Sequence, residues 1–141
     1  MSLKSFLKQN VKPAQHEKVQ ISNRIIDQET GEPEYWEIRA LDSYEVDECE
    51  RQATKLQRVG KTDRYEAQTD QGKFALMTMT RAIVYPDLTD QELQDSYGVN
   101  NPEDLLCKML LPGERQQLII ICNRLNNYEQ SLDDAVEQSK N

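Results

Sequence analysis

The chain has 141 residues, of which 37% are hydrophobic and 30% charged, and its formal net charge is −8. This length fits one domain, so we expect residues 1–141 to form a single one. Nucleic-acid binding draws most of its affinity from basic groups that neutralise phosphates, so the acidic balance disfavours a nucleic-acid partner. The longest apolar run, residues 118–122, is far shorter than the roughly 20 residues that a membrane span needs, so no membrane partner is expected.

The residues of common catalytic and metal sites are missing from the sequence. Its three cysteines, Cys49, Cys107 and Cys122, form no C-x-x-C pair, and their odd number predicts free, reduced thiols. The single histidine, His16, has no nearby ligand pair with which to begin a zinc site. No G-x-S-x-G, H-E-x-x-H, P-loop or G-x-G-x-x-G motif occurs. We therefore expect no enzymatic activity, no cofactor and no metal.

The N-terminal part of the chain predicts a short helix followed by a β-hairpin. In residues 1–12, apolar residues fall at the spacing of one helix face, and Pro13 ends the helix. In residues 17–40, apolar and polar residues alternate on both sides of the turn-forming stretch 30–33. Trp36 falls on the inner face of this hairpin, where aromatic residues usually belong to the core. Because two strands alone are marginally stable, the hairpin must pack on helices or on another subunit.

Residues 42–139 predict a mainly helical body. Its first helix has a strongly acidic outer face and ends at Gly60. The polar stretch 60–73 is predicted to be a loop with at most one helical turn. Residues 74–85 are apolar around the whole circumference of a helix, which predicts a central buried helix that Pro86 ends.

Capping residues and prolines predict the remaining helices. Thr89 begins a capping-box sequence that opens a short helix, and Asn101 followed by Pro102 marks the start of the next. Pro112 opens a longer helix, and Ser131 begins a last, weak one. The apolar stripe of the longer helix consists of Leu118, Ile121, Cys122, Leu125 and Tyr128. Together the elements predict an α+β fold, mainly α, with a two-stranded antiparallel hairpin packed on a bundle of about five to six helices.

Two short helices meet at the sequence Tyr97-Gly98-Val99, which has the form of a helix-turn-helix. The second helix, however, begins with Glu103 and Asp104, where a DNA-reading helix would meet phosphates with the wrong charge. We interpret this pair as helix packing.

The helix after Pro112 carries the candidate partner-binding residues. Ile119 and Ile120 lie outside its main stripe, so this helix is either buried on two sides or presents an apolar surface. Such a surface suits a partner protein or a second copy of the chain, and both alternatives stay open. The predicted surface consists of Leu118, Ile119, Ile120 and Leu125, with Leu110 and Leu111 at its rim.

Several segments of the chain also match a known family in order and spacing. They are residues 3–7, residues 35–38, Tyr85-Pro86-Asp87-Leu88, Leu93-Gln94-Asp95-Ser96-Tyr97-Gly98-Val99 and Met109-Leu110-Leu111-Pro112-Gly113-Glu114. In these segments the chain resembles the XkdN-like tail assembly chaperones of long-tailed phages and defective prophages of Gram-positive bacteria.

The resemblance implies a small, non-enzymatic protein that works in the cytoplasm of the bacterial host and is absent from the finished particle. Its implied partner is the tape measure protein, which it keeps soluble while the tail tube protein polymerises around it. The net charge and two adaptable methionines, Met77 and Met79, suit that role. Two alternatives are a structural tail component retained in the virion, such as a connector or terminator, and an acidic regulatory module with a basic partner.

Overall fold

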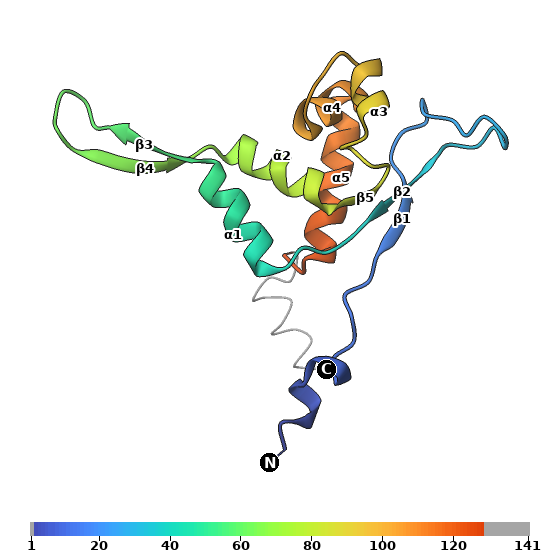
Figure 1. Cartoon of the computed structure of the whole chain (residues 1–141), viewed down its shortest axis with the longest axis horizontal. Helices are drawn as coiled ribbons and strands as arrows, with labels where there is room; N and C mark the ends of the chain where they lie inside the picture. The colour runs from blue at the N-terminus through green and yellow to red at the C-terminus, as the bar shows by residue number, and fades with distance from the viewer. Residues whose placement is uncertain (1, 129–141) are drawn as a thin grey trace.

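A computed structural model of the chain describes residues 2–128, so the helix expected from Ser131 lies outside the described residues. The α-helices are α1 (Ser43–Gln52), α2 (Gln71–Ala82), α3 (Gln91–Ser96), α4 (Pro102–Met109) and α5 (Pro112–Leu125). The strands are β1 (Glu17–Gln20), β2 (Tyr35–Ile38), β3 (Thr54–Arg58), β4 (Tyr65–Thr69) and β5 (Ile83–Tyr85). The fold is α+β. In Figure 1, α2 and α5 lie at the centre, beside a small sheet, while β3 and β4 project to one side.

The predicted N-terminal helix is replaced by two 3₁₀ turns, Lys4–Phe6 and Lys8–Asn10, neither of which has a buried residue. The apolar residues on which the prediction rested point into solvent, since Leu3 is 75% exposed and Phe6 79% exposed. Short helices are marginal in water unless an apolar face packs against something. This segment has no such contact, which explains the difference.

The predicted hairpin of β1 and β2 is confirmed, and its register pairs Val19 with Trp36. A third strand, β5, pairs antiparallel with β2, which gives the order β1-β2-β5. The prediction of one helix over 74–85 was therefore wrong at its end. The chain leaves the helix at Ala82, whose carbonyl accepts a 2.8 Å hydrogen bond from the Arg39 amide. Ile83 and the residues after it are β-branched or aromatic and suit the strand that follows.

The prediction of a helix up to Gly60 and a loop over 60–73 was also wrong. The helix α1 ends at Gln52, and β3 and β4 then form a second antiparallel hairpin. Leu56 lies within the range of the predicted helix, but it belongs to β3 and is 74% exposed. Gly60 has a positive φ of 58° in the connection between the strands, a conformation that suits a turn and not a helix interior.

The core lies between the inner face of the three-stranded sheet and helices α2, α4 and α5. Trp36, expected in the core, is 1% exposed, which confirms its placement. The side chains that are completely buried are Ile38, Cys49, Ala82, Leu105, Leu106 and Leu118.

The predicted helix starts are confirmed at α4 and shifted by one residue at α3. Asn101 caps α4, because its side-chain oxygen accepts a 2.8 Å hydrogen bond from the Asp104 amide. At α3 the cap is Asp90 and not Thr89. The reason is local, since the Thr89 hydroxyl donates a 2.6 Å hydrogen bond to Asp87 and is not available to cap the helix.

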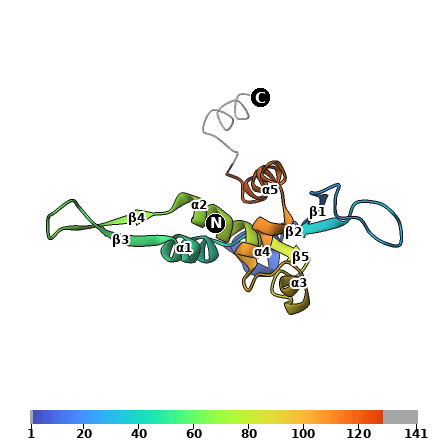
Figure 2. The same ribbon diagram turned by 90° about the horizontal axis from the view of Figure 1, so that it is seen from above.

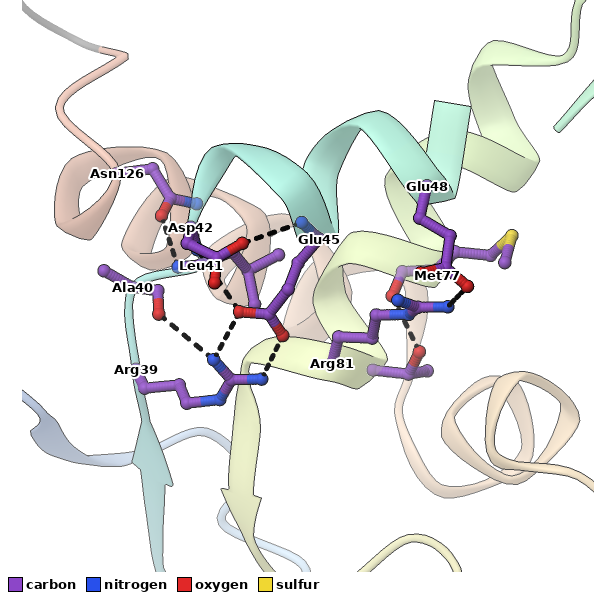
Figure 3. A network of polar contacts seen from close by, with 10 residues as sticks. Arg39, Ala40, Leu41, Asp42, Glu45, Glu48, Met77, Arg81 and Asn126 are labelled. Carbon is purple, nitrogen blue, oxygen red and sulfur yellow. Dashed lines mark hydrogen bonds and ion pairs between the residues drawn. The ribbon is translucent and has the colours of Figure 1, made fainter. Parts of the chain in front are cut away.

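A polar network joins α1 to the sheet and to α5 (Figure 3). The Arg39 guanidinium donates two hydrogen bonds, of 2.9 and 2.6 Å, to the two carboxylate oxygens of Glu45. These bonds lower the pKa of Glu45 from its ordinary value. The Leu41 amide donates a 2.8 Å hydrogen bond to the side chain of Asn126, at the C-terminal end of α5. The network therefore sets the position of α1 relative to α5.

A second ion pair joins the segment after β1 to the start of α5. The Arg24 guanidinium lies 2.6 Å from a Glu114 carboxylate oxygen and also donates a 2.9 Å hydrogen bond to the Met109 carbonyl. Desolvation opposes ionisation of Glu114, but the hydrogen bonds that it accepts, led by that from Arg24, outweigh it and lower the pKa of this carboxyl to about 2.

This ion pair predicts a loss of stability in acid. Because the pKa of Glu114 is lower in the folded state than its ordinary value of 4.5, the stabilisation is complete above about pH 4.5 and disappears as the pH falls towards 2. We expect Glu114→Gln to lower the free energy of unfolding at pH 7 by on the order of 1–2 kcal/mol, a figure reduced for screening of the half-exposed Arg24. Urea unfolding should show this difference shrinking between pH 5 and pH 3. A difference independent of pH would contradict the assignment.

Candidate partner-binding groove

A cleft of about 740 Å³ lies between α2 and the N-terminal ends of α4 and α5. Two smaller clefts continue it along the same side of the molecule. One, of about 180 Å³, shares Ala75 and Ile119 with the first. The other, of about 230 Å³, reaches the start of α1 and shares Val46, Asn126 and Tyr128 with the second. We call the three together the α2–α5 groove.

Small side chains on α2 create the hollow. Gly72, Ala75 and Thr78 line the groove and are spaced three residues apart, so they share one face of the helix. Across from them, α5 contributes Ile119, which is half-buried. Because a small side chain leaves space that a leucine would fill, the groove follows the line of these residues.

Flexible apolar side chains form a buried part of the groove lining, which we call its floor. Met77 and Met79 are each only 6% exposed and line the largest cleft. Methionine side chains are unbranched and polarisable, so they adapt to apolar partners of different shape. The groove therefore offers an adaptable apolar surface.

The rim of the groove is charged and acidic on balance. Two basic residues, Lys73 and Arg115, lie at the largest cleft. Four acidic residues accompany them: Glu103 and Asp104 at that cleft, and Asp42 and Asp47 at the cleft near α1. An apolar floor with charged edges is the arrangement that binds one face of an amphipathic helix.

Comparison with known proteins identifies the family. A family model described as "Phage XkdN-like tail assembly chaperone protein, TAC" matches residues 3–140. The chain belongs to this family. The resemblance noted in the sequence is therefore confirmed, and the general role of the protein is in phage tail assembly.

The chain is also similar to a Bacillus protein over most of its length. The uncharacterised protein YqbN of Bacillus subtilis (strain 168) is 26% identical over 129 residues, which cover 91% of this chain and 85% of YqbN. A crystal structure of a protein YqbN superposes with a TM-score of 0.74 at 22% identity, covering 90% of this chain and 97% of that one. At this identity the match shows a shared fold.

The structure places the six predicted partner-binding residues in different environments. Leu110 and Leu118 are buried in the core, being 4% and 0% exposed, and Leu125 is half-buried against it. Leu111 and Ile120 are more than half exposed, but neither lines the groove formed by the described residues. Only Ile119 lies in the groove. Whether any of the six contacts a partner stays a prediction.

The contribution of α2 to the groove was missed. The apolar character of residues 74–85 predicted a central buried helix, and this part of the prediction describes α2 well up to Ala82. The three-residue spacing of Gly72, Ala75 and Thr78 is the signal that could have shown that one side of that helix is hollow.

The described residues of this tail assembly chaperone include its three cysteines. Burial raises the pKa of the Cys122 thiol, which lines the groove, to about 12, and also raises the pKa of Cys49. Cys107 is exposed. No group of three potential metal ligands lies together in this part of the chain. Nor does any helix in it have the length and apolar character that crossing a membrane requires.

Proposed function

We propose that this tail assembly chaperone binds apolar helix faces of the tape measure protein in the α2–α5 groove and keeps that protein soluble while the tail tube assembles. The single observation that carries the proposal is the groove itself, with its methionine floor and charged rim. A helical partner would insert side chains spaced three and four residues apart. The chaperone's net charge of −8 would keep the complex in solution.

We also propose where the protein acts and at which stage of tail assembly it dissociates. It acts in the host cytoplasm, binds the tape measure protein before the tail tube protein surrounds it, and is absent from the finished particle. The alternative role, a connector or terminator, would keep the protein in the particle. Mass spectrometry of purified tails separates the two, because stoichiometric peptides of this chain in the particle would contradict the chaperone proposal.

Co-expression with the tape measure protein tests the groove directly. Ala75 is half-buried and lines two of the clefts, and arginine is a good helix former, so Ala75→Arg should fill the groove without breaking α2. Ile120→Arg adds the same side chain at an exposed site of α5 outside the groove, and so tests the predicted surface on α5 separately. We expect Ala75→Arg to weaken binding of the tape measure protein about tenfold, or about 1.4 kcal/mol, and so to lower the soluble fraction of that protein.

Circular dichroism of the two purified variants confirms that each is folded before the solubility assay is interpreted. A folded Ala75→Arg variant that still keeps the tape measure protein soluble would contradict the groove assignment. Loss of solubilisation in Ile120→Arg alone would place the contact on the exposed side of α5.

A further inference from the structure

The β3–β4 hairpin extends away from the body of the molecule and has almost no packing of its own (Figure 1, Figure 2). Every side chain from residue 55 to residue 68 is exposed, including Leu56 at 74% and Tyr65 at 62%. An isolated two-stranded hairpin is marginally stable in water and usually needs a surface to cover one face. The hairpin therefore has an unpartnered face.

The register of the hairpin shows what that face is made of. Leu56 pairs with Ala67, and Arg58 pairs with Tyr65. Because directly opposed residues and residues two apart share a face, these four side chains lie together. The face is apolar in its middle and basic towards its tip.

The hairpin is also basic within an acidic protein. Residues 54–69 contain four basic and two acidic residues, a net charge of +2 in a chain of −8. Two of the basic residues, Lys61 and Arg64, belong to the exposed connection between the strands. A surface that covers this hairpin should therefore combine apolar and acidic groups.

Such a surface exists on the lobe formed by α3, α4 and the segments that flank them. Residues 82–109, which include the whole of α4, contain six acidic residues and one basic residue, Lys108. In the described residues 2–128, none of these six carboxylates forms an ion pair within 4.0 Å. Exposed apolar side chains lie on or beside the lobe, since Tyr97 is 38% and Tyr85 55% exposed. The six acidic residues are Asp87, Asp90, Glu92, Asp95, Glu103 and Asp104.

The hairpin cannot cover the lobe of its own chain. Both views place the hairpin beyond α1 and α2, with α3 and α4 on the opposite side of these helices (Figure 1, Figure 2). A lobe that this hairpin contacts would therefore have to belong to another molecule.

We propose that the β3–β4 hairpin of one copy docks on the α3–α4 lobe of a second copy. The two surfaces are different and lie on opposite sides of the chain, so each copy has one free hairpin and one free lobe. Contacts of this kind are heterologous and repeat head to tail, giving a ring where the rotation closes and a filament where it does not. This association goes beyond the proposed client binding and uses neither α5 nor the floor of the groove.

Charge reversal on each side tests the contact. Lys61→Glu/Arg64→Glu reverses the charge at the tip of the hairpin. It leaves Arg58 unchanged, because Arg58 donates a hydrogen bond to the Thr62 carbonyl. Glu92→Lys/Asp95→Lys reverses the charge of α3 on the lobe and leaves unchanged Asp90, the residue that caps this helix. A third variant, Lys4→Glu/Lys8→Glu, makes the same charge change in the exposed N-terminal segment as the hairpin variant and is its control.

Light scattering and sedimentation over a range of protein and salt concentrations give the readout. We expect the unmodified protein to associate beyond a dimer at low salt, and less as salt rises. Each reversed variant should associate at least about tenfold more weakly, while the N-terminal control associates as the unmodified protein does. An equimolar mixture of the hairpin and lobe variants should regain association, because each hairpin then meets a lobe of opposite charge.

Three results would overturn the proposal: an unmodified protein that is monomeric at every concentration, reversed variants that associate normally, or a mixture that does not recover. If the hairpin variant associates normally but no longer keeps the tape measure protein soluble, the hairpin binds the client and not a second copy. Circular dichroism of each variant excludes misfolding as the cause of any loss.

Discussion

Replacing Leu118 with aspartate is expected to unfold the protein, whereas the same replacement at Ile120 leaves it folded. Leu118 is completely buried, and an unpaired carboxylate in that position costs several kcal/mol. The whole stability of a domain is only about 5–15 kcal/mol, so most of it is lost. Ile120 is 56% exposed, and an aspartate there stays in water, where surface changes usually alter stability by less than about 0.5 kcal/mol.

Far-UV circular dichroism and urea unfolding of the two variants decide this prediction. A folded Leu118→Asp variant with an unchanged unfolding midpoint would show that the core is packed differently around α5. The comparison also affects any test of client binding, because both residues were predicted to form a partner surface. Loss of client binding in a Leu118 variant would reflect loss of the fold. Loss of client binding in an Ile120 variant would reflect loss of a direct contact with the client.

Trp36→Ala is expected to destabilise the protein by about 3–5 kcal/mol. Trp36 is 1% exposed, lies on the central strand of the sheet β1-β2-β5, and contributes to the main core cluster. Removing its ring leaves a large cavity between the sheet and the helices, and surrounding side chains fill such cavities only in part. Trp36→Phe keeps most of the volume and apolar surface and is the control.

Urea unfolding followed by circular dichroism measures this effect, because Trp36 is the only tryptophan and its fluorescence disappears with the substitution. We expect the phenylalanine variant to lose clearly less stability than the alanine variant. Equal and small losses in both would mean that the sheet contributes little to the cooperative core.

The two proposals share Glu103 and Asp104, which belong to both the groove rim and the lobe, but the variants that test them change different residues. Client binding depends on Ala75 and the methionine floor of the groove, whereas self-association depends on the hairpin tip and α3. A variant that fills the groove should still self-associate. A variant in which the charge of the hairpin is reversed should still keep the tape measure protein soluble. If either variant lost both client binding and self-association, one surface would serve both interactions.

Helix starts were predicted well because their signals are local. A cap side chain hydrogen-bonds backbone amides two or three residues away, so Asn101 before Pro102 is sufficient to begin α4. The one-residue shift at α3 also has a local cause. Asp87 and Asp90 both lie near Thr89, and the threonine hydroxyl hydrogen-bonds the first of them. Sequence spacing alone does not decide between two neighbouring caps.

Strands were predicted less well because a strand depends on its partner. Residues 83–85 have high strand propensity, but only pairing with β2 makes them extend and end α2. The same is true of β3, where Leu56 continues a helical pattern that began in α1. Pairing of Leu56 with Ala67 overrides that pattern and turns the side chain into solvent.

By itself the sequence determined the mainly helical α+β class, the first hairpin, the buried place of Trp36 and the membership of a tail assembly chaperone family. Only the tertiary structure decided which faces are hollow or unpartnered. The α2–α5 groove exists because small residues of one helix face Ile119 of another. The hairpin is free because the side chains of residues 55–68 all remain exposed in the folded chain. Both depend on contacts between distant segments, which local propensity and spacing do not encode.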